Sequence, residues 1–288
     1  MNVLITGASG QLGSEIASIS SLYPKMNFFF ATSKTIDICD FNELESYVLQ
    51  NKINSIINCA AYTQVDKAEE EFELAAKVNI VGVANLVKVL KKNHGSLIHV
   101  STDYVFDGKS YIPYKESDTT NPLGVYGETK LKGEEKIINS TINAIIIRTS
   151  WLYSEFGNNF VKTMLRLGNN RESLGVIADQ VGTPTNAKDL AFACLDILSK
   201  HEELNKNGSI YHYSNEGAAT WYDFAAAIME ISKTDCLVLP IETKDYPTLA
   251  IRPQYSILNK SNIKNDFELS ILNWRESLEK CIKKIQKK

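Results

Sequence analysis

Short apolar runs alternate with longer stretches of helical periodicity through the first half of this 288-residue chain. Each run is continuously apolar rather than alternating, which is typical of strands that are buried on both faces of a sheet. Strands separated by helices favour an α/β fold with a doubly wound parallel sheet. The expected strands are residues 2–6, 27–31, 55–59, 96–101 and 144–148.

Helical periodicity in the same half predicts helices at residues 11–22, 68–92 and 126–139. After about residue 151 the alternation becomes irregular. We therefore expect residues 1–150 to form the main domain and residues 151–288 a smaller α/β lobe, from which some segments return to the first domain. In that second part a strand is expected at 174–177 and helices at 157–167, 187–198, 221–232 and 274–287.

The composition narrows the classes of function. The formal net charge is −3, which gives no indication of a nucleic-acid partner or of an anionic membrane surface. No run approaches the roughly 20 apolar residues of a membrane span. The five cysteines are scattered, without a C-x-x-C pair, which is typical of reduced thiols in the cytoplasm. We also expect no signal peptide, because no basic segment leads into an apolar one at the N-terminus.

A glycine loop follows the first expected strand directly. Gly7, Gly10 and Gly13 form a G-x-x-G-x-x-G pattern that opens a helix. Such glycines allow a tight turn, a close approach to a pyrophosphate and close packing of helix on strand, while free N–H groups at the helix start attract phosphate. The strand and the helix on either side make this loop a predicted dinucleotide site, of Rossmann-like type. Residues 1–150 are thus the expected dinucleotide-binding domain, and residues 151–288 the expected substrate lobe. Its expected cofactor contacts are Gly7, Ser9, Gly10, Gln11, Leu12 and Gly13.

The end of the second strand bears on the choice of dinucleotide. NAD sites usually carry an acid there for the ribose 2′-hydroxyl, but this chain has Thr32 followed by Ser33 and Lys34. The absence of a carboxylate and the nearby cation favour NADPH, and NADH remains the alternative. Asp37 and Ile38 are expected near the adenine. Small residues after the third strand predict further contacts at Ala60, Ala61, Tyr62 and Thr63.

Tyr126 and Lys130 form a Y-x-x-x-K pair on an expected helix. Positions four apart share one helix face, so phenol and ammonium can point into one site. A cation about 4 Å away could lower the phenol pKa by up to roughly three units. A second such pair, Tyr111 and Lys115, has Pro113 between its members, which spoils a helix interior. Tyr126 is therefore the candidate proton donor.

The segment Ser101-Thr102-Asp103 ends the fourth strand, at the sheet edge where ligands of open α/β folds bind. The Thr102 hydroxyl can hydrogen-bond the same substrate oxygen that Tyr126 protonates. Asp103 beside it is a candidate for sugar hydroxyls.

Together these motifs resemble the extended short-chain dehydrogenase/reductase family, and within it the reductases of 4-keto-6-deoxy sugar nucleotides. The later segments are more specific than the glycine loop. The matching segments are residues 58–69, 101–108, 126–130, 148–153, 157–160, 179–185, 220–223 and 252–253.

The resemblance implies reduction of the C4 keto group of a dTDP-linked sugar by NADPH or NADH, for cell-surface polysaccharide synthesis. In that family Tyr126 corresponds to the proton donor to the C4 oxygen and Thr102 to the group that positions the carbonyl. Lys130 corresponds to the residue that holds the nicotinamide ribose and tunes the phenol. Trp151 resembles a residue that packs on sugar or cofactor, with a core indole as the alternative. Arg252 resembles a phosphate contact, with a surface ion pair as the alternative.

Some bacterial members are magnesium-linked homodimers through acidic residues. Glu15 and Asp189 are the corresponding candidates, but Lys188 adds a cation to that cluster. We therefore expect no metal site and no dimer formed through one, while a homodimer of another kind is allowed. The histidines (His94, His99, His201 and His212) lack metal-ligand spacing and are expected to be structural.

Two other functions stay open. A related dehydratase would read Thr-Asp-Glu after the fourth strand, where this chain has Tyr104, and epimerases usually have a longer second lobe. Another sugar-nucleotide reductase or an epimerase thus remains an alternative. A non-catalytic subunit resembling the regulatory subunit of methionine adenosyltransferase is a further one. The presence of Thr102, Tyr126 and Lys130 together favours an enzyme.

Overall fold

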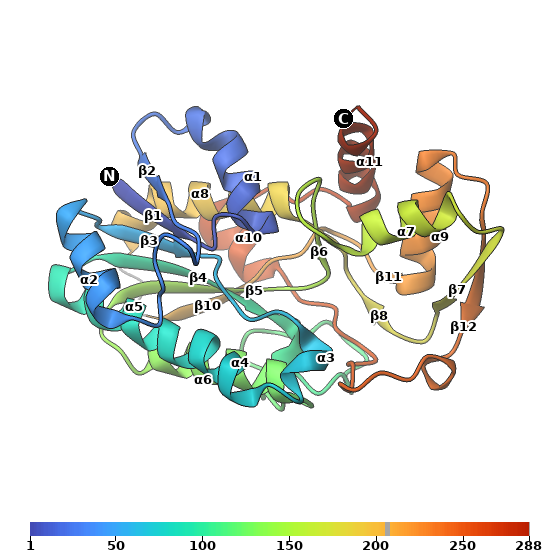
Figure 1. The fold of residues 1–288 in the computed structure, drawn as a ribbon, viewed down its shortest axis with the longest axis horizontal. Coiled ribbons are helices and arrows are strands. Elements are labelled where there is room, and N and C mark those ends of the chain that lie inside the picture. The colour runs from blue at the N-terminus through green and yellow to red at the C-terminus, as the bar shows by residue number, and fades with distance from the viewer. Residues whose placement is uncertain (205–207, 288) are drawn as a thin grey trace.

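A computed structural model describes residues 1–204 and 208–287, with the side chains of 201–204 left out. Its centre is a six-stranded sheet in the order β10-β5-β4-β3-β1-β2, in which every pairing is parallel (Figure 1). This confirms the expected fold class. The strands are β1 (Asn2–Thr6), β2 (Asn27–Phe30), β3 (Ser55–Asn58), β4 (Ser96–Thr102), β5 (Asn143–Thr149) and β10 (Ser209–His212).

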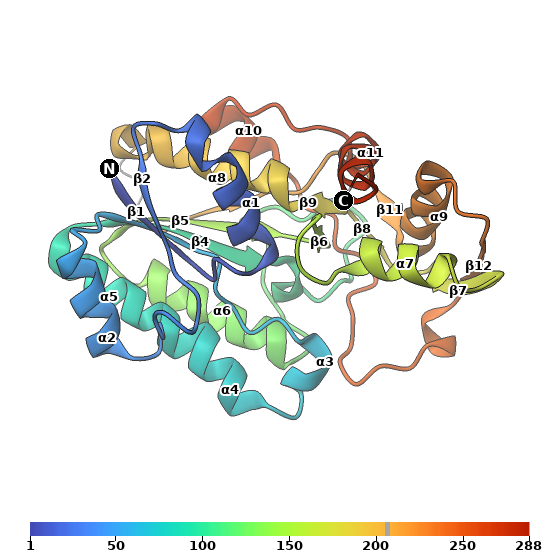
Figure 2. The ribbon, with the colours of Figure 1, turned by 45° about the horizontal axis from the view of Figure 1, so that its top comes forward.

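Helices cover both faces of this sheet (Figure 2). Side chains alternate along each strand, so in β1 Val3 and Ile5 face one apolar cluster and Leu4 faces the other. The first cluster is closed by α1 (Gln11–Ile19), α8 (Ala187–Leu204) and α10 (Ser261–Phe267). The second is closed by α2 (Phe41–Gln50), α5 (Val83–Asn93) and α6 (Val125–Ile138). Both faces are therefore apolar, as the continuous runs predict.

The long helix expected at residues 68–92 is wrong in one respect, because the structure divides it. Val65–Ala68 form α3, Phe72–Ala76 form α4, and a π-helical turn at Lys77–Gly82 leads into α5. The side chain of Asn79, inside that turn, hydrogen-bonds both backbone groups of Tyr62. A π-turn carries one more residue than an α-turn and is common at functional sites.

The second lobe, on the right of Figure 1, is built on a third apolar cluster. Two short parallel strands, β7 (Ser173–Ile177) and β12 (Leu237–Ile241), pair with each other. Helices α7 (Phe160–Gly168), α9 (Trp221–Ser232) and α11 (Trp274–Ile285) pack around them. The remaining strands are the two-residue pairs β6 (Leu152–Tyr153) with β9 (Thr185–Asn186) and β8 (Val181–Gly182) with β11 (Ala219–Thr220).

The chain after residue 150 contributes to both lobes. Strand β10 forms the edge of the main sheet beside β5, and α8 packs on α1. The division at residue 150 stays a prediction. None of the described helices is long and apolar enough to cross a membrane.

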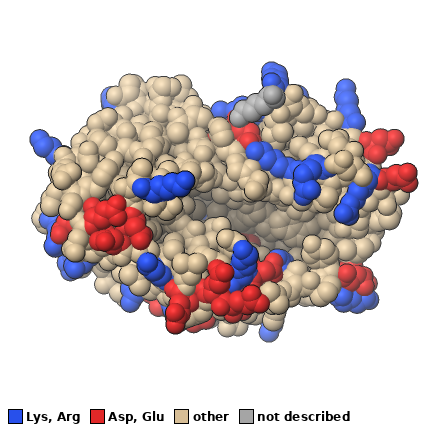
Figure 3. Space-filling view, in the orientation of Figure 1, with Lys and Arg blue, Asp and Glu red and all other residues tan. Residues whose placement is uncertain are grey.

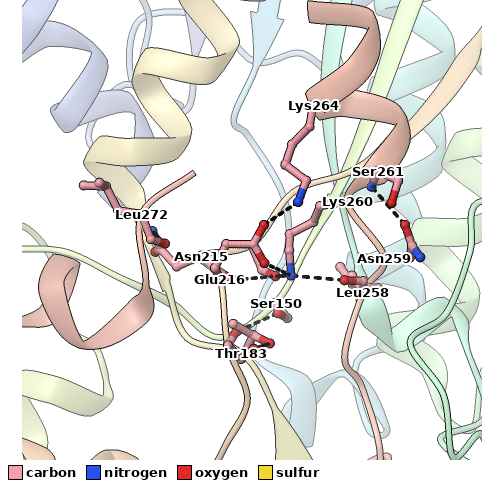
Figure 4. Close-up of polar contacts among 12 residues, drawn as sticks. Ser150, Thr183, Asn215, Glu216, Leu258, Asn259, Lys260, Ser261, Lys264 and Leu272 are labelled. Atoms are coloured by element: carbon pink, nitrogen blue, oxygen red, sulfur yellow. Dashed lines mark hydrogen bonds and ion pairs between the residues drawn. The ribbon is translucent and has the colours of Figure 1, made fainter. Parts of the chain in front are cut away.

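Polar contacts connect the segments where the two lobes meet (Figure 4). Ser150, just after β5, donates to the Thr183 carbonyl at 2.7 Å. The buried Lys260 donates to the Leu258 carbonyl at 3.2 Å and lies 3.6 Å from the Glu216 carboxylate. Lys264 pairs with the same carboxylate at 2.7 Å. The first contact joins the end of β5 to the segment between β8 and β9, and the lysine contacts join the loop after β10 to α10.

Candidate functional site

A cavity of about 790 Å³ opens at the carboxyl ends of β1, β3, β4 and β5. The space-filling view shows this face hollowed between the main sheet and the second lobe, with charged side chains mainly at the rim (Figure 3). Nearly all the predicted site residues line this one cavity. They are Gly7, Ser9, Gly10, Gln11, Leu12, Thr32, Asp37, Ile38, Ala60, Ala61, Tyr62, Thr63, Thr102, Asp103, Tyr126, Lys130 and Trp151.

The glycine loop has the close contacts that its pattern predicts. Gly7 has a φ of +63°, and a Cβ there would lie 2.7 Å from the Ala60 backbone nitrogen. Gly13 does not line the cavity; a Cβ on it would lie 2.6 Å from Ala8 Cα, so its role is close packing of α1 on the loop. Helix α1 begins without a side-chain cap and without an acid in its first turn. Its first N–H groups therefore suit a phosphate group.

The loop after β2 lines one end of the cavity. Thr32 and Ser33 line it, while Lys34 is exposed. The Asp37 carboxylate accepts from the Cys39 backbone N–H at 2.9 Å. No described residue at the end of β2 places a carboxylate where the NAD pattern expects one, so the structural basis for expecting NADPH remains.

Asn79 ties the loop after β3 to α6. Its side-chain oxygen accepts from the Tyr62 N–H at 2.9 Å, and its amide donates to the Tyr62 carbonyl at 3.2 Å and to the Thr129 hydroxyl at 3.1 Å. Thr129 directly precedes Lys130 on α6. The π-turn that carries Asn79 thus links the loop after β3 to the helix that carries the Tyr/Lys pair.

Tyr126 lies in the cavity with its pKa raised to about 12, because burial disfavours the phenolate. A hydrogen bond with the Thr102 side chain acts in the opposite direction. The expected lowering of this pKa by Lys130 is therefore wrong for this structure, since desolvation outweighs the other influences. Tyr104 meets Tyr126 edge-on, with ring centroids 5.4 Å apart.

The side-chain nitrogen of Lys130 faces the sheet. It donates to the Val100 carbonyl at 2.7 Å and lies 3.4 Å from His99 Nε2. Burial lowers the pKa of Lys130 to about 8. Spacing along the helix correctly predicts a shared cavity for Tyr126 and Lys130, but not the partners on β4 that the lysine takes.

Thr102 and Asp103 follow β4 as predicted. The Thr102 hydroxyl donates to Asp103 Oδ1 at 3.0 Å and accepts from the Tyr104 N–H. Burial raises the pKa of Asp103 to about 6, although hydrogen bonds from Ser256 and Thr102 oppose the shift.

Trp151 and Arg252 have different surroundings. Trp151 has a φ of +47°, a region that large residues rarely adopt and that is often found at functional sites. Its ring stacks on Trp221, with centroids 3.6 Å apart. Arg252 lines a neighbouring cavity of about 470 Å³ and pairs with the Asp66 carboxylate at 2.7 and 3.1 Å. The ion pair allowed in the sequence analysis is present, and a phosphate contact by Arg252 stays a prediction.

Sequence reasoning missed a buried ion pair beneath the site. Glu134 on α6 binds Arg148 on β5 through contacts of 2.6, 3.0 and 3.2 Å and accepts from the Ser101 hydroxyl at 2.5 Å. The available signal in the sequence is Arg148 near the end of an otherwise apolar strand, whereas Glu134 is one of several charged residues of α6. Glu134 is one helical turn beyond Lys130, so this pair anchors the helix that carries the catalytic candidates.

The residues of the suspected metal cluster lie elsewhere. Glu15, Lys188 and Asp189 line a cavity of about 740 Å³ beside α11. Glu15 accepts from the Ser154 hydroxyl at 2.6 Å. Within residues 1–204 and 208–287, no group of three or more His, Cys, Asp or Glu is placed to hold a metal ion. His201 lies among the residues whose side chains the structure does not describe.

Comparison with known proteins gives one consistent family. The RmlD substrate binding domain model matches residues 1–287. A dTDP-4-dehydrorhamnose reductase from Aggregatibacter actinomycetemcomitans is 42% identical, over 96% of each chain. A crystal structure of a dTDP-4-dehydrorhamnose reductase from Clostridium acetobutylicum has a TM-score of 0.93 and 38% identity, and covers 99% of this chain and 100% of that one. The corresponding enzyme from Bacillus anthracis, solved in complex with NADP, has a TM-score of 0.93 and 36% identity, with 98% and 99% covered.

Proposed function

This chain belongs to the RmlD substrate binding domain family, and on that premise we propose that it reduces the C4 keto group of dTDP-4-dehydro-L-rhamnose to give dTDP-L-rhamnose. The observation that carries the proposal is the meeting of Tyr126, Thr102 and Lys130 with the glycine loop in one cavity. NADPH is the proposed reductant and supplies the hydride when bound. The product would serve cell-surface polysaccharide synthesis.

The proposed roles follow from the chemistry of each side chain. A phenol with a pKa of about 12 keeps its proton at neutral pH and can transfer it to an oxygen that gains negative charge. Tyr126 therefore suits proton donation to the C4 oxygen. The Thr102 hydroxyl, next to Tyr126, suits a hydrogen bond to the same oxygen. Asp103 suits the sugar hydroxyls, and Trp151 offers an apolar wall.

The residues present also fit the proposed cofactor. The uncapped start of α1 would hold the pyrophosphate. The close contacts at Gly7 leave no space there for a side chain. Thr32 and Ser33 would border the ribose phosphate, and Asp37 with Ile38 the adenine. Lys130 would hold the nicotinamide ribose.

The test follows loss of NADPH absorbance with the dTDP-linked 4-keto sugar, and identifies the sugar product. Tyr126→Phe is expected to bind NADPH but to lose turnover by about 10²–10⁴-fold. Tyr111→Phe is the matched control, because Tyr111 has the same spacing to a lysine but is 89% exposed; its turnover should equal that of the parent.

The outcomes separate the alternatives. Cofactor binding without reduction would replace the proposal with a binding subunit. A reduced sugar of different C4 configuration, or an epimerised one, would indicate another enzyme of the same fold. Cytoplasmic location and a homodimer are further expectations, which fractionation of cells and light scattering of the purified protein test.

A further inference from the structure

A line of buried polar side chains crosses three neighbouring strands beneath the cofactor cavity and ends at Lys130. Thr6 on β1 lies opposite Asn58 on β3, and Asn58 lies opposite His99 on β4. All three are 1% exposed, and Lys130 is 2% exposed. Polar groups at such depth are normally hydrogen-bonded in a definite pattern. The direction of each hydrogen bond in this line can be worked out.

The orientation of the Asn58 amide is set by a backbone group. The Ala60 N–H can only donate, and the Asn58 side-chain atom 3.2 Å from it is therefore the oxygen. The Thr6 hydroxyl donates to the same oxygen at 2.6 Å. The amide nitrogen is consequently turned to His99 Nδ1, 2.9 Å away. Because an amide nitrogen only donates, Nδ1 must accept.

The tautomer of His99 follows from this acceptor role. Burial, together with the charge of Lys130, holds the pKa of His99 well below its usual range, so the ring is neutral. A neutral ring that accepts at Nδ1 carries its hydrogen on Nε2. Nε2 is the atom that lies 3.4 Å from the Lys130 nitrogen.

We propose that His99 is a positioning residue whose Nε2–H, fixed by Asn58, faces the side-chain nitrogen of Lys130 and favours its neutral amine over the ammonium. An N–H dipole stabilises an amine lone pair but is repelled by an ammonium. The role of Lys130 itself rests on the proposed function; the tautomer of His99 does not.

Other groups on the elements packed around Lys130 also influence its protonation. Burial lowers its pKa, whereas Glu134 on the same helix and Cys59 after β3 raise it. The carboxylate of Glu134 is occupied by Arg148 and Ser101. The Val100 carbonyl accepts from either protonation state of the lysine. The contact with His99 differs from these, because its effect on the protonation of Lys130 changes sign with the tautomer of the ring.

The first experiment examines the parent protein and needs no turnover. The full chain is labelled with ¹⁵N-histidine, and the signals of His99 are assigned by their loss in His99→Gln. At neutral pH we expect Nε2 to carry the hydrogen and Nδ1 to carry none. A hydrogen on Nδ1, or an imidazolium, would overturn the proposal even if the reductase activity is present. The expected spectrum supports it even if that activity is absent.

The second experiment reverses the tautomer. In Asn58→Asp one carboxylate oxygen still accepts from Ala60 and Thr6, while the other accepts from His99 Nδ1–H. Nε2 then accepts from the Lys130 ammonium, and the alkaline midpoint of the pH profile of kcat/KM should rise by about one unit.

The control separates the tautomer from the added charge. His99→Phe removes the ring nitrogens, and Asn58→Asp is then introduced into that background. The shift of the alkaline midpoint should be much smaller between His99→Phe and the double variant than between the parent and Asn58→Asp. An equal shift in both backgrounds would mean that charge alone acts, and would overturn the proposal. If Asn58→Asp does not fold, the spectrum of the parent protein decides.

Discussion

Replacing Glu134 by leucine removes one partner of the ion pair beneath the active site. Glu134 is fully buried and Arg148 is 2% exposed. The guanidinium has three contacts with this carboxylate, and its Nη1 has no hydrogen-bond partner among the described residues. Phe106 provides a ring 5.1 Å from the guanidinium carbon, but no compensating negative charge. The variant Glu134→Leu would therefore leave the buried guanidinium without the carboxylate that contacts it, with Glu116 acting on it only from a greater distance.

The size of the effect follows from this burial. Removing one member of a buried pair costs about 3–5 kcal/mol of unfolding free energy. An unfolding entropy of about 2.1 cal/mol/K per residue amounts to about 0.6 kcal/mol/K for a chain of 288 residues. Glu134→Leu should therefore lower Tm by about 5–8 °C. Because the charge is the cause, Glu134→Leu with Arg148→Met should recover most of the loss.

Calorimetry and urea unfolding of parent, single and double variants measure this directly. Glu279→Gln is the control, because Glu279 likewise pairs with a cation, Lys283, but that pair lies on the surface. The control should leave Tm unchanged. A loss below about 1 kcal/mol for Glu134→Leu, or a double variant no more stable than the single one, would refute the reasoning.

Four further changes have defined outcomes. Gly13→Ala places a Cβ 2.6 Å from backbone atoms of the loop and should weaken NADPH binding at least tenfold in fluorescence titration. Thr32→Asp should weaken binding of NADPH more than that of NADH, because a carboxylate repels the 2′-phosphate. Trp221→Ala removes the stack under Trp151 and should raise KM for the sugar about two- to tenfold, with Trp221→Phe in between and little change in kcat. The pKa of Asp103, about 6, exceeds the roughly 3.9 of an unfolded aspartate, so its stabilising influence is complete below about pH 4 and is lost as the pH rises through 6. Over this pH range the parent should lose at most roughly 3 kcal/mol of unfolding free energy through Asp103. Asp103→Asn should not show this loss when urea unfolding of both proteins is measured at both ends of the range.

Local patterns predicted much of the fold. The helix expected at 221–232 has those bounds in the structure, because Thr220 and Asp223 form a capping box that marks its start. The glycine loop and the Tyr/Lys pair lie in one cavity because parallel strands end at the same sheet edge. These features depend on neighbours in the chain or on a general rule of parallel sheets.

Features that depend on distant partners could not be predicted in this way. The pairing of Arg252 with Asp66 joins residues 186 positions apart. The raised pKa of Tyr126 reflects burial in the folded cavity, which the helical spacing to Lys130 does not report. The π-turn at Asn79 depends on the backbone of Tyr62, so a continuous apolar stripe gave no sign of it.

The position of β10 has a consequence for how the chain folds during synthesis. Its partner β5 is complete at Thr149, but β10 begins only at Ser209. A nascent chain that ends before then has β5 as an uncovered edge strand, open to pairing with other chains. Because residues 150–208 separate the two strands in the sequence, their pairing is a long-range contact, and such contacts slow folding. We therefore expect fragments that end near residue 150 to aggregate, and the emergence of residues 209–212 from the ribosome to be the step that covers β5.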